Sequence, residues 1–348
     1  MKRKLFAFFT AAAMTFCALF CGCSCSGEDA LSFSALNTVR EKTEYAVNYD
    51  EHYNDFTKKD ATLDSVLAFE YSEGKFVSEI TAATKDGLTS DILDIKDAKG
   101  QPLVGTVYLL TSDFGIDLKV TVNGKEFNHR EKIIKKVYFA DTGVSLAPLY
   151  SEEDAEYFII YTSSNNAEPQ IIKRTTVTVY DKDAYSAVTA AKAFAADTAA
   201  ENLTMDGAIT QEYTSKYSFR SAIDNAALLY AIRGVKPEEN ATKNLNVISS
   251  AYQEPVALAV KNNGAAEKSF TINYNGAPVT ETIKYDQLSF AVNKTNASGV
   301  SQYVSVQSAD TETFKNSLLL EYAEPLSTQD SYLKMGALVF TLTSVTVN

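Results

Sequence analysis

Apolar and polar side chains alternate with a period of two over most of the chain after residue 62. The run Val66–Tyr71 shows this alternation first, and similar runs recur as far as Leu338–Val347. A period of two places successive side chains on opposite faces of a strand, whereas a helix repeats about every 3.6 residues. Asn123-Gly124 and Asn275-Gly276 lie between such runs, and Asn-Gly is a strong signal for a two-residue hairpin turn. The chain is therefore predicted to be mainly β, with antiparallel strands.

Two turn-rich stretches in the first half support this prediction. Gly74 lies between the alternating runs Val66–Tyr71 and Phe76–Ile80, which predicts a hairpin. Farther along, Asp97–Leu103 combines Asp and Gly, which favour a turn, with a Pro that suits an edge strand. This second stretch resembles the first hairpin of bacterial immunoglobulin-like surface domains. The resemblance covers a short segment and implies a β-sandwich.

Two helices are predicted between the β-rich stretches. Asp183 is a good N-cap for an alanine-rich segment that continues to about Leu203, and alanine has the highest helix propensity. Phe219–Arg233 repeats apolar residues with helical spacing, and Gly234 is predicted to end this second helix.

The predicted organisation is two antiparallel β-sandwich-like domains, residues 61–182 and 246–348, with a helical linker or insertion at 183–245. The class is mainly β, or α+β overall. Both β stretches carry similar marks in the same order, among them an Asn-Gly turn, an acidic turn (Glu152–Asp154 in the first) and an Ala-Glu-Pro triplet. This order suits a duplicated β module, and two unrelated β domains with ordinary turns are the equally open alternative.

Residues 1–22 have the composition of an export signal. Three basic residues at positions 2–4 precede an uncharged run that begins at Leu5, and Gly22 precedes Cys23. A basic head, an apolar middle and a small residue before the cleavage point are typical of a signal peptide. A plain secretory signal cut near Ser26 and an uncleaved membrane anchor are the alternatives.

The end of this segment resembles the lipobox of bacterial lipoprotein precursors, in which a small residue precedes a cysteine that is lipidated after cleavage. Cys23 fits best because Gly22 is small, whereas Phe20 before Cys21 is too large. The resemblance implies a diacylglyceryl group and an N-acyl chain on Cys23, and two or more chains hold a protein stably on a bilayer. It also implies the extracytoplasmic face of a bacterial cell membrane.

Residues 23–60 are predicted to form a lipidated tether with an aromatic stretch. Tyr45, Tyr49 and Tyr53 recur at steps of four, which on a helix would form one aromatic stripe, and a strand over Tyr45–Tyr49 is the alternative. Large apolar stripes are usually buried as core. The competing interpretation is that the three tyrosines form a platform on which a ligand stacks.

Charge and cysteine content exclude several classes of function. The net charge is −12, and loss of the basic signal segment makes it more negative, so the surface repels nucleic-acid phosphates. All four cysteines lie in the first 25 residues, which leaves the folded part without a disulfide or a thiolate metal site. Two histidines, His52 and His129, and no glycine-rich phosphate loop give no sign of a nucleophilic triad or of a cofactor.

Acidic residues supply the remaining chemical candidates. Asp141-Thr142-Gly143 resembles the catalytic motif of aspartic proteases, which need two such aspartates sharing one proton, and the second half has no equivalent. Carboxylates in loops suit calcium, and Asp181 with Asp183 at the domain junction is the calcium candidate. The alternative function is therefore a carboxylate-based extracytoplasmic hydrolase, either glycosidase-like or aspartic-protease-like.

The function favoured by the sequence is a membrane-anchored lipoprotein that acts as a binding, adhesion or envelope-interaction module without catalysis. An acidic body on a tether, with no catalytic constellation, supports it. The expected partners are the membrane, through the lipid anchor, and a protein or glycan ligand that the residues do not identify.

Overall fold

The computed structural model describes residues 6–10, 40–51, 53, 67–82, 107–122, 124–141, 146–163, 166–181, 186–196, 208–212, 223–248, 256–292, 301–315, 317–327 and 334–347. Most of these residues lie in β-strands, so the mainly β class is confirmed. The α-helix within these ranges, α3 (Leu228–Ala231), has four residues. None of the described helices combines the length and the apolar character that a membrane crossing requires.

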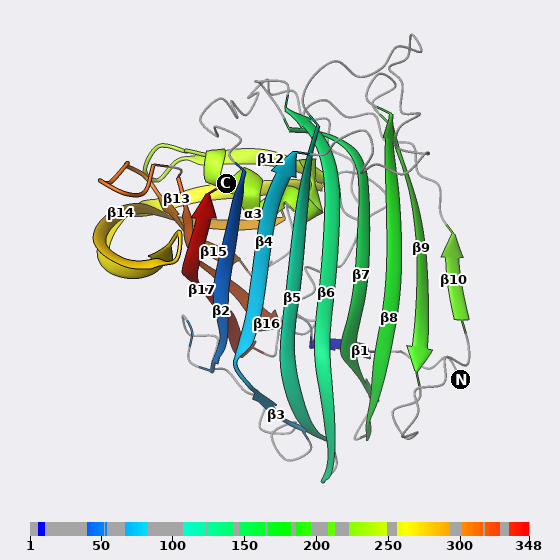
Figure 1. Ribbon diagram of the computed structural model, residues 1–348. Coiled ribbons are helices and arrows are strands. Elements are labelled where there is room, and N and C mark those ends of the chain that lie inside the picture. The colour runs from blue at the N-terminus through cyan, green and yellow to red at the C-terminus, as the bar shows by residue number, and fades with distance from the viewer. Residues whose placement is uncertain are drawn as a thin grey trace.

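Seven strands of the first half pair in chain order and form the large sheet at the front of Figure 1. They are β4 (Gly74–Ala82), β5 (Val107–Val122), β6 (Lys125–Asp141), β7 (Leu146–Ser163), β8 (Asn166–Asp181), β9 (Ser186–Ala196) and β10 (Ala208–Glu212). Each strand is antiparallel to the next, and we call the series the first meander. Strands β5 to β8 are about three times as long as an average strand.

Six strands of the second half form another antiparallel series, the second meander. They are β12 (Thr242–Ile248), β13 (Val256–Tyr274), β14 (Ala277–Val292), β15 (Gln302–Gln307), β16 (Leu319–Ser327) and β17 (Lys334–Val347). The end of β13 also pairs in parallel with β17, which closes β13 to β17 into a ring. A bulge after Asn262, where Gly264 has φ +118°, bends β13 toward this closure. Figure 1 shows the resulting curl of β14.

The two meanders belong to one hydrogen-bonded sheet. Strand β2 (Glu41–Asp50) is antiparallel to β17 on one side and to β4 on the other, and β11 (Ile223–Asp224) is parallel to the end of β12. One cluster of buried residues draws members from both meanders, among them Phe114 and Phe340, whose ring centroids lie 5.7 Å apart. The predicted pair of separate sandwich-like domains is therefore not confirmed, and the duplication stays a prediction.

The predicted hairpin around Gly74 is wrong. Strands β3 (Leu67–Tyr71) and β4 lie end to end, and both pair with β5. The amide of Ser72 donates a hydrogen bond to Asp117 O at 2.9 Å across the break between them. Gly74 is needed at this point because a Cβ would lie 2.9 Å from Gly115 O. A glycine that indicated a turn instead permits the close approach of two strands.

The first predicted helix is also wrong, because Ser186–Ala196 is strand β9, paired with β8 along its whole length. Alanine favours a helix locally, but the hydrogen bonds that β9 makes along the edge of β8 outweigh this preference. The second predicted helix is shorter than expected: η4 (Asn225–Ala227), α3 and η5 (Ile232–Gly234) follow one another. It ends at Gly234, as predicted.

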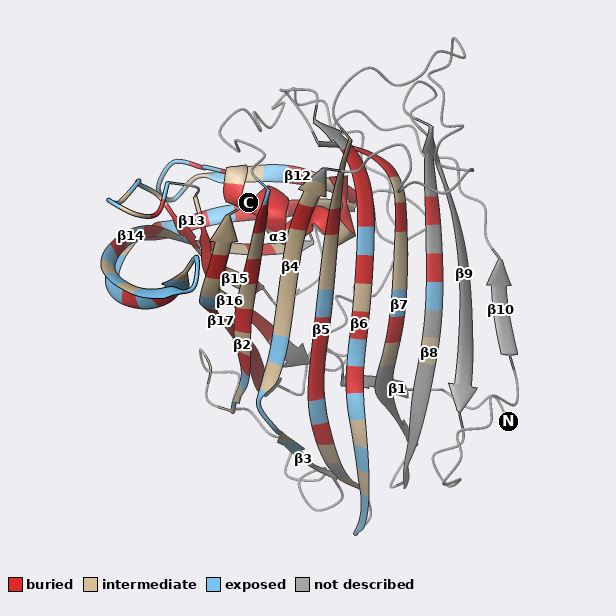
Figure 2. Ribbon diagram, in the orientation of Figure 1, coloured by how far each residue is buried: buried red, intermediate tan, exposed pale blue. Residues whose placement is uncertain are grey.

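Strands β12 and β16 and the α3 segment lie behind β4 to β6, so this part of the large sheet is covered on one face and open on the other, which we call the water-facing side (Figure 1). Figure 2 shows the resulting alternation of buried and exposed residues along β5 and β6. The water-facing side carries cross-strand ion pairs, such as Lys119 Nζ to Glu126 Oε1 at 2.8 Å. Glu44 of β2 pairs at 2.7 Å both with Lys75 of the neighbouring strand β4 and with Lys42 of its own strand.

Candidate functional site

Several residues predicted to be functional lie outside the described residues or at the end of a described segment. Cys23, His52 and Asp183 lie outside the described residues, and Asp181 is the last residue of β8. Strand β1 (Phe6–Thr10), inside the predicted signal peptide, is antiparallel to β7. Lipidation at Cys23 and calcium binding at Asp181 and Asp183 therefore stay predictions.

The aromatic stretch is a strand, which was the alternative to a helix, and the predicted tether therefore contains β2. Tyr45 is 5% exposed, and its hydroxyl donates to Leu319 O at 3.1 Å. Burial raises the pKa of Tyr45 to about 12. Tyr49 and Tyr53 are half-buried, and their ring centroids lie 5.2 and 6.0 Å from those of two other tyrosines. Tyr45 is core, whereas a ligand role for Tyr49 and Tyr53 stays a prediction.

The triplet Glu152–Asp154 lies inside β7 and forms no turn. Lys136 is opposite Glu152 and Lys135 is opposite Glu153, with Nζ–Oε2 distances of 3.5 and 3.2 Å. This acidic run is therefore matched by the lysines of the neighbouring strand. Among the described residues, no three Asp, Glu, His or Cys side chains are grouped as a metal site.

The sequence-predicted hydrolase stays a prediction, because most of its candidate motif lies outside the described residues. Asp141 ends β6, and the rest of its Asp-Thr-Gly motif lies outside the described residues. His129 is half-buried near the other end of the same strand, and burial lowers its pKa. The described part of this motif thus supplies one carboxylate, whereas aspartic-protease chemistry needs two.

Polar side chains meet in the interior where the large sheet faces the second meander. We call Lys135, Glu153, Gln302, Tyr322 and Glu324 the interior polar cluster. The Tyr322 hydroxyl donates to Glu324 Oε2 at 3.0 Å and accepts from Gln302 Nε2 at 3.0 Å. Lys135 pairs with Glu153, and its charge also acts on Glu324. The Lys135 ammonium group thus interacts with two carboxyl groups, that of Glu153 in the first meander and that of Glu324 in the second.

Within this cluster, the carboxyl group of Glu324 has a strongly raised pKa. Burial raises its pKa to about 8, although hydrogen bonds from Tyr322 and Gln302 and the charge of Lys135 favour the ionised form. Desolvation disfavours a charged carboxylate, so Glu324 holds its proton at neutral pH. A shifted carboxyl group can indicate catalysis. At 7% exposure, however, Glu324 is covered by protein, which argues against contact with a substrate.

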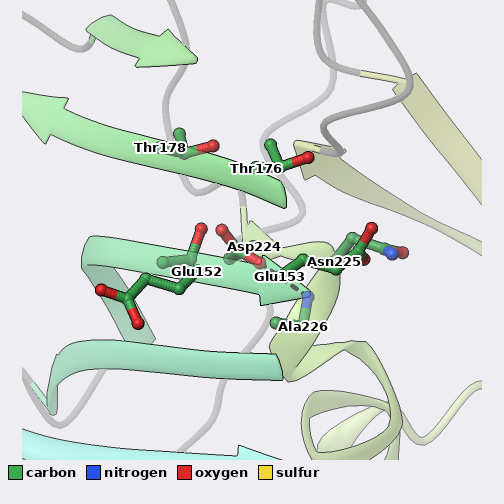
Figure 3. A pocket seen from close by; sticks show the side chains of 8 residues that line it. Glu152, Glu153, Thr176, Thr178, Asp224, Asn225 and Ala226 are labelled. Atoms are coloured by element: carbon green, nitrogen blue, oxygen red, sulfur yellow. Dashed lines mark hydrogen bonds between the residues drawn. The ribbon is translucent and has the colours of Figure 1, made fainter. Parts of the chain in front are cut away.

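A small cavity, which we call the seam cavity, lies between β8 and the β11–η4 segment (Figure 3). Its lining consists of Ser151, Glu152, Glu153, Thr176, Thr178, Asp224, Asn225 and Ala226. Asp224 Oδ1 accepts a hydrogen bond from Ala226 N at 2.6 Å and so caps η4. The cavity volume of about 20 Å³ matches one water molecule and is far too small for a substrate.

A buried ion pair fixes β2 against the η5 segment. The Arg233 guanidinium donates to both carboxylate oxygens of Glu41, and Arg233 Nε donates to Ser317 O at 2.9 Å. Arg233 and Glu41 are 5% and 3% exposed. Breaking one side of such a pair leaves an uncompensated buried charge, so this contact is structural and strongly coupled.

A wider hollow opens at the surface over β3, β5 and β6, with a volume of about 470 Å³. We call it the surface hollow, and its lining is Glu70, Tyr71, Ser72, Asp117, Leu118, Lys119, Asn128, His129 and Arg130. Arg130 Nη1 pairs with Asp117 Oδ1 at 2.8 Å, and the guanidinium lies across Gly115, where a Cβ would come within 2.9 Å of it. The hollow combines apolar and aromatic side chains with charges of both signs.

Sequence reasoning missed both the interior polar cluster and the surface hollow. Lys135 occupies an inward position of the β6 alternation, between Ile133 and Val137, and this polar interruption was a usable signal for a buried partner. Nothing in the local pattern named Glu324 as a neighbour, because it lies on β16, far away in the chain. The surface hollow was equally hidden from the local pattern, because its lining comes from three strands, β3, β5 and β6, that only the fold brings together.

Comparisons with known proteins show a similarity in fold. No family model matches the chain, and no curated protein matches it in sequence. The fold is similar to the crystal structure of a beta-barrel-like protein of domain of unknown function DUF1849 from Brucella abortus, with 7% sequence identity and a TM-score of 0.41. The alignment covers 90% of this chain and 99% of that chain.

Proposed function

We propose that this chain is an extracytoplasmic bacterial lipoprotein, held to the cell membrane through acyl chains on Cys23, that binds a protein or glycan ligand and does not catalyse a reaction. The observation that carries the binding role is the surface hollow. Its volume of about 470 Å³ falls in the range of ligand sites, and apolar and polar groups line it together. The lipobox-like sequence before Cys23 supports the membrane location.

The absence of catalysis is proposed from the state of the described acids and bases. Glu324 and Glu153 lie in the interior, where they contact Tyr322 and Lys135. The carboxylates at the surface hollow, Glu70 and Asp117, pair with cations across the strands. A general acid or base must reach a substrate within hydrogen-bond distance, and the interior acids do not lie at a substrate-sized opening.

Metabolic labelling with palmitate tests the membrane anchor. We expect the wild-type chain to incorporate label and to fractionate with membranes, and Cys23→Ser to lose both properties. Cys25→Ser is the matched control, because it removes the neighbouring thiol and leaves Cys23 in place. Label retained by Cys23→Ser, or a mature N-terminus without lipid in mass spectrometry, would overturn the anchor.

A binding screen with variants of the hollow tests the ligand role. The mature chain is applied to a glycan array and to envelope proteins, next to Lys119→Glu and Arg130→Glu. Lys268→Glu is the control, since this exposed lysine of β13 forms an equivalent surface ion pair with Glu321 at 3.1 Å. Binding lost in both hollow variants and kept in Lys268→Glu supports the assignment. A ligand bound equally by all four chains, or no ligand at all, contradicts it.

A substrate panel tests the hydrolase alternative. Peptides and glycosides are incubated with the mature chain, with Asp141→Asn and with Glu324→Gln. We expect no turnover by any of them. Turnover by the wild type that either variant abolishes would replace the binding role with catalysis.

A further inference from the structure

Polar residues from both halves of the molecule line the seam cavity. Thr176 lies on β8 of the first meander, and Asn225 lies on η4, the segment that leads into the second meander. Thr176 is 3% exposed and Asn225 is 5% exposed. Figure 3 shows both side chains at the cavity, with Thr178 and Asp224 beside them.

Two buried atoms at this cavity lack the hydrogen bonds that their burial demands. In the described part of the chain, Thr176 Oγ1 and Asn225 Oδ1 have no hydrogen-bond partner. A buried polar atom without a partner costs about 1–3 kcal/mol, and most such atoms in native proteins are paired with protein or water. Two such atoms line one cavity and come from segments far apart in sequence, which indicates that they share one hydrogen-bonding partner.

We propose that one water molecule occupies the seam cavity, accepts a hydrogen bond from the Thr176 hydroxyl, donates one to Asn225 Oδ1, and so links β8 to η4. The volume of about 20 Å³ is enough for one water and little else. Water suits this pair of atoms because it donates and accepts at once. The cavity is lined by further oxygen groups, which lets the water complete its usual three or so hydrogen bonds.

A cation fits the same cavity less well. Glu153, one of the three acids in its lining, already pairs with the Lys135 ammonium at 3.2 Å, and a second cation would compete with that group. Asp224 Oδ1 is engaged with the backbone of η4. Although three acids belong to the lining, no three Asp, Glu, His or Cys side chains among the described residues are grouped so that they could hold a metal ion.

The sign of a stability change distinguishes a water-filled cavity from a dry one. Thr176→Val replaces the hydroxyl by a methyl group of similar size. If water bridges the two atoms, we expect the unfolding equilibrium constant to rise about five- to tenfold, because the water and Asn225 lose a partner. In a dry cavity the same change removes an unpaired polar atom, so it would leave stability unchanged or increase it.

Thr175→Val is the matched control on the same strand. Its hydroxyl bonds Asp154 Oδ1 at 2.8 Å on the exposed face, so a much smaller change is expected. Asn225→Ala completes a double-mutant cycle with Thr176→Val, and a bridging water predicts that the two effects are not additive. Oxygen-17 relaxation dispersion should show one long-lived water fewer in Thr176→Val than in the wild type.

Three outcomes would overturn the proposal. The first is an unchanged or raised stability of Thr176→Val. The second is additivity in the cycle together with an equal count of long-lived waters in both chains. The third is stabilisation of the wild type, but not of Thr176→Val, by millimolar CaCl₂ at constant ionic strength, which would identify a cation in place of water.

Discussion

The two meanders share one period of alternation but fill their inward faces differently. In the second meander the buried positions are mostly large and apolar, such as Leu258, Ile272 and Phe290, and the buried polar residues are Asn262, Gln302, Gln307 and Glu324 among those described. In the first meander the buried positions include polar and charged side chains: Glu131, Lys135, Ser151, Thr176 and Thr178. Among the described residues, polar side chains therefore form a larger share of the buried positions in the first meander than in the second.

This difference predicts different sensitivities. Apolar contacts are non-directional and do not depend on pH, whereas a buried polar group depends on a particular partner and on its own protonation. The interior polar cluster brings both kinds together, because the Tyr322 ring stacks on Phe290 of the second meander at 6.5 Å while its hydroxyl bonds Glu324. We therefore expect single polar substitutions in the interior to matter more than those on the water-facing side.

The largest effect is expected at the buried ion pair. Arg233→Met should lower the free energy of unfolding by about 3–5 kcal/mol, because Glu41 keeps a buried charge without its partner. Arg130→Met is the matched control, since Arg130 and Asp117 have side chains 60% and 58% exposed, and about 0–1 kcal/mol is expected there. Urea unfolding followed by circular dichroism measures both. Equal losses in the two variants would remove the distinction between buried and exposed polar contacts.

Glu324 should make stability depend on pH. Its pKa is about 8 in the folded chain against 4.5 normally, so the folded state binds this proton more tightly than the unfolded state. Its contribution is complete below pH 4.5 and is lost as the pH rises through 8, and about 3–4 kcal/mol of this change falls between pH 5 and 8.5. Unfolding of the wild type and of Glu324→Gln at intervals from pH 5 to 8.5 gives the difference. Parallel profiles would show that Glu324 does not titrate in this range.

Steric fit, and not polar pairing, should limit substitution at Gly336 near the start of β17. Gly336 has φ +79°, and a Cβ would overlap Asp50 O and lie 2.8 Å from Glu51 Cα. Gly336→Ala should destabilise by about 2–3 kcal/mol. Gly276→Ala is the control, because φ there is +88° with nothing within 4 Å, and about 1 kcal/mol is expected. Thermal unfolding compares them, and equal shifts would exclude the close contact as the cause.

The smallest effect is expected on the water-facing side of the second meander. Thr271 and Thr280 share a hydroxyl hydrogen bond of 2.9 Å across β13 and β14, where both side chains are exposed. Thr271→Val should change the free energy of unfolding by no more than about 0.5 kcal/mol, because water replaces the lost partner. A loss as large as that of Thr176→Val would contradict the contrast between the two faces.

The local sequence predicted a large part of the strand framework. The Asn275-Gly276 turn is found as expected, with φ of 49° and 88° at its two residues and Tyr274 paired with Ala277. Strand boundaries were less predictable. The apolar runs 104–110 and 118–122 predict two strands, whereas residues 107–122 form one strand, β5, because the residues between the runs continue the alternation. A polar interruption on the exposed face does not end a strand.

What the sequence determined by itself was the period of the strands, the position of the Asn275-Gly276 turn and the end of the short helical segment at Gly234. Each of these follows from backbone preferences within a few residues. The tertiary structure alone decided that Ser186–Ala196 extends the sheet, that β2 pairs with β17, and that the charge of Lys135 acts on Glu324. These outcomes depend on which strand edge or which charged side chain the folded chain places next to a segment. The residues of the segment itself carry no information about that neighbour.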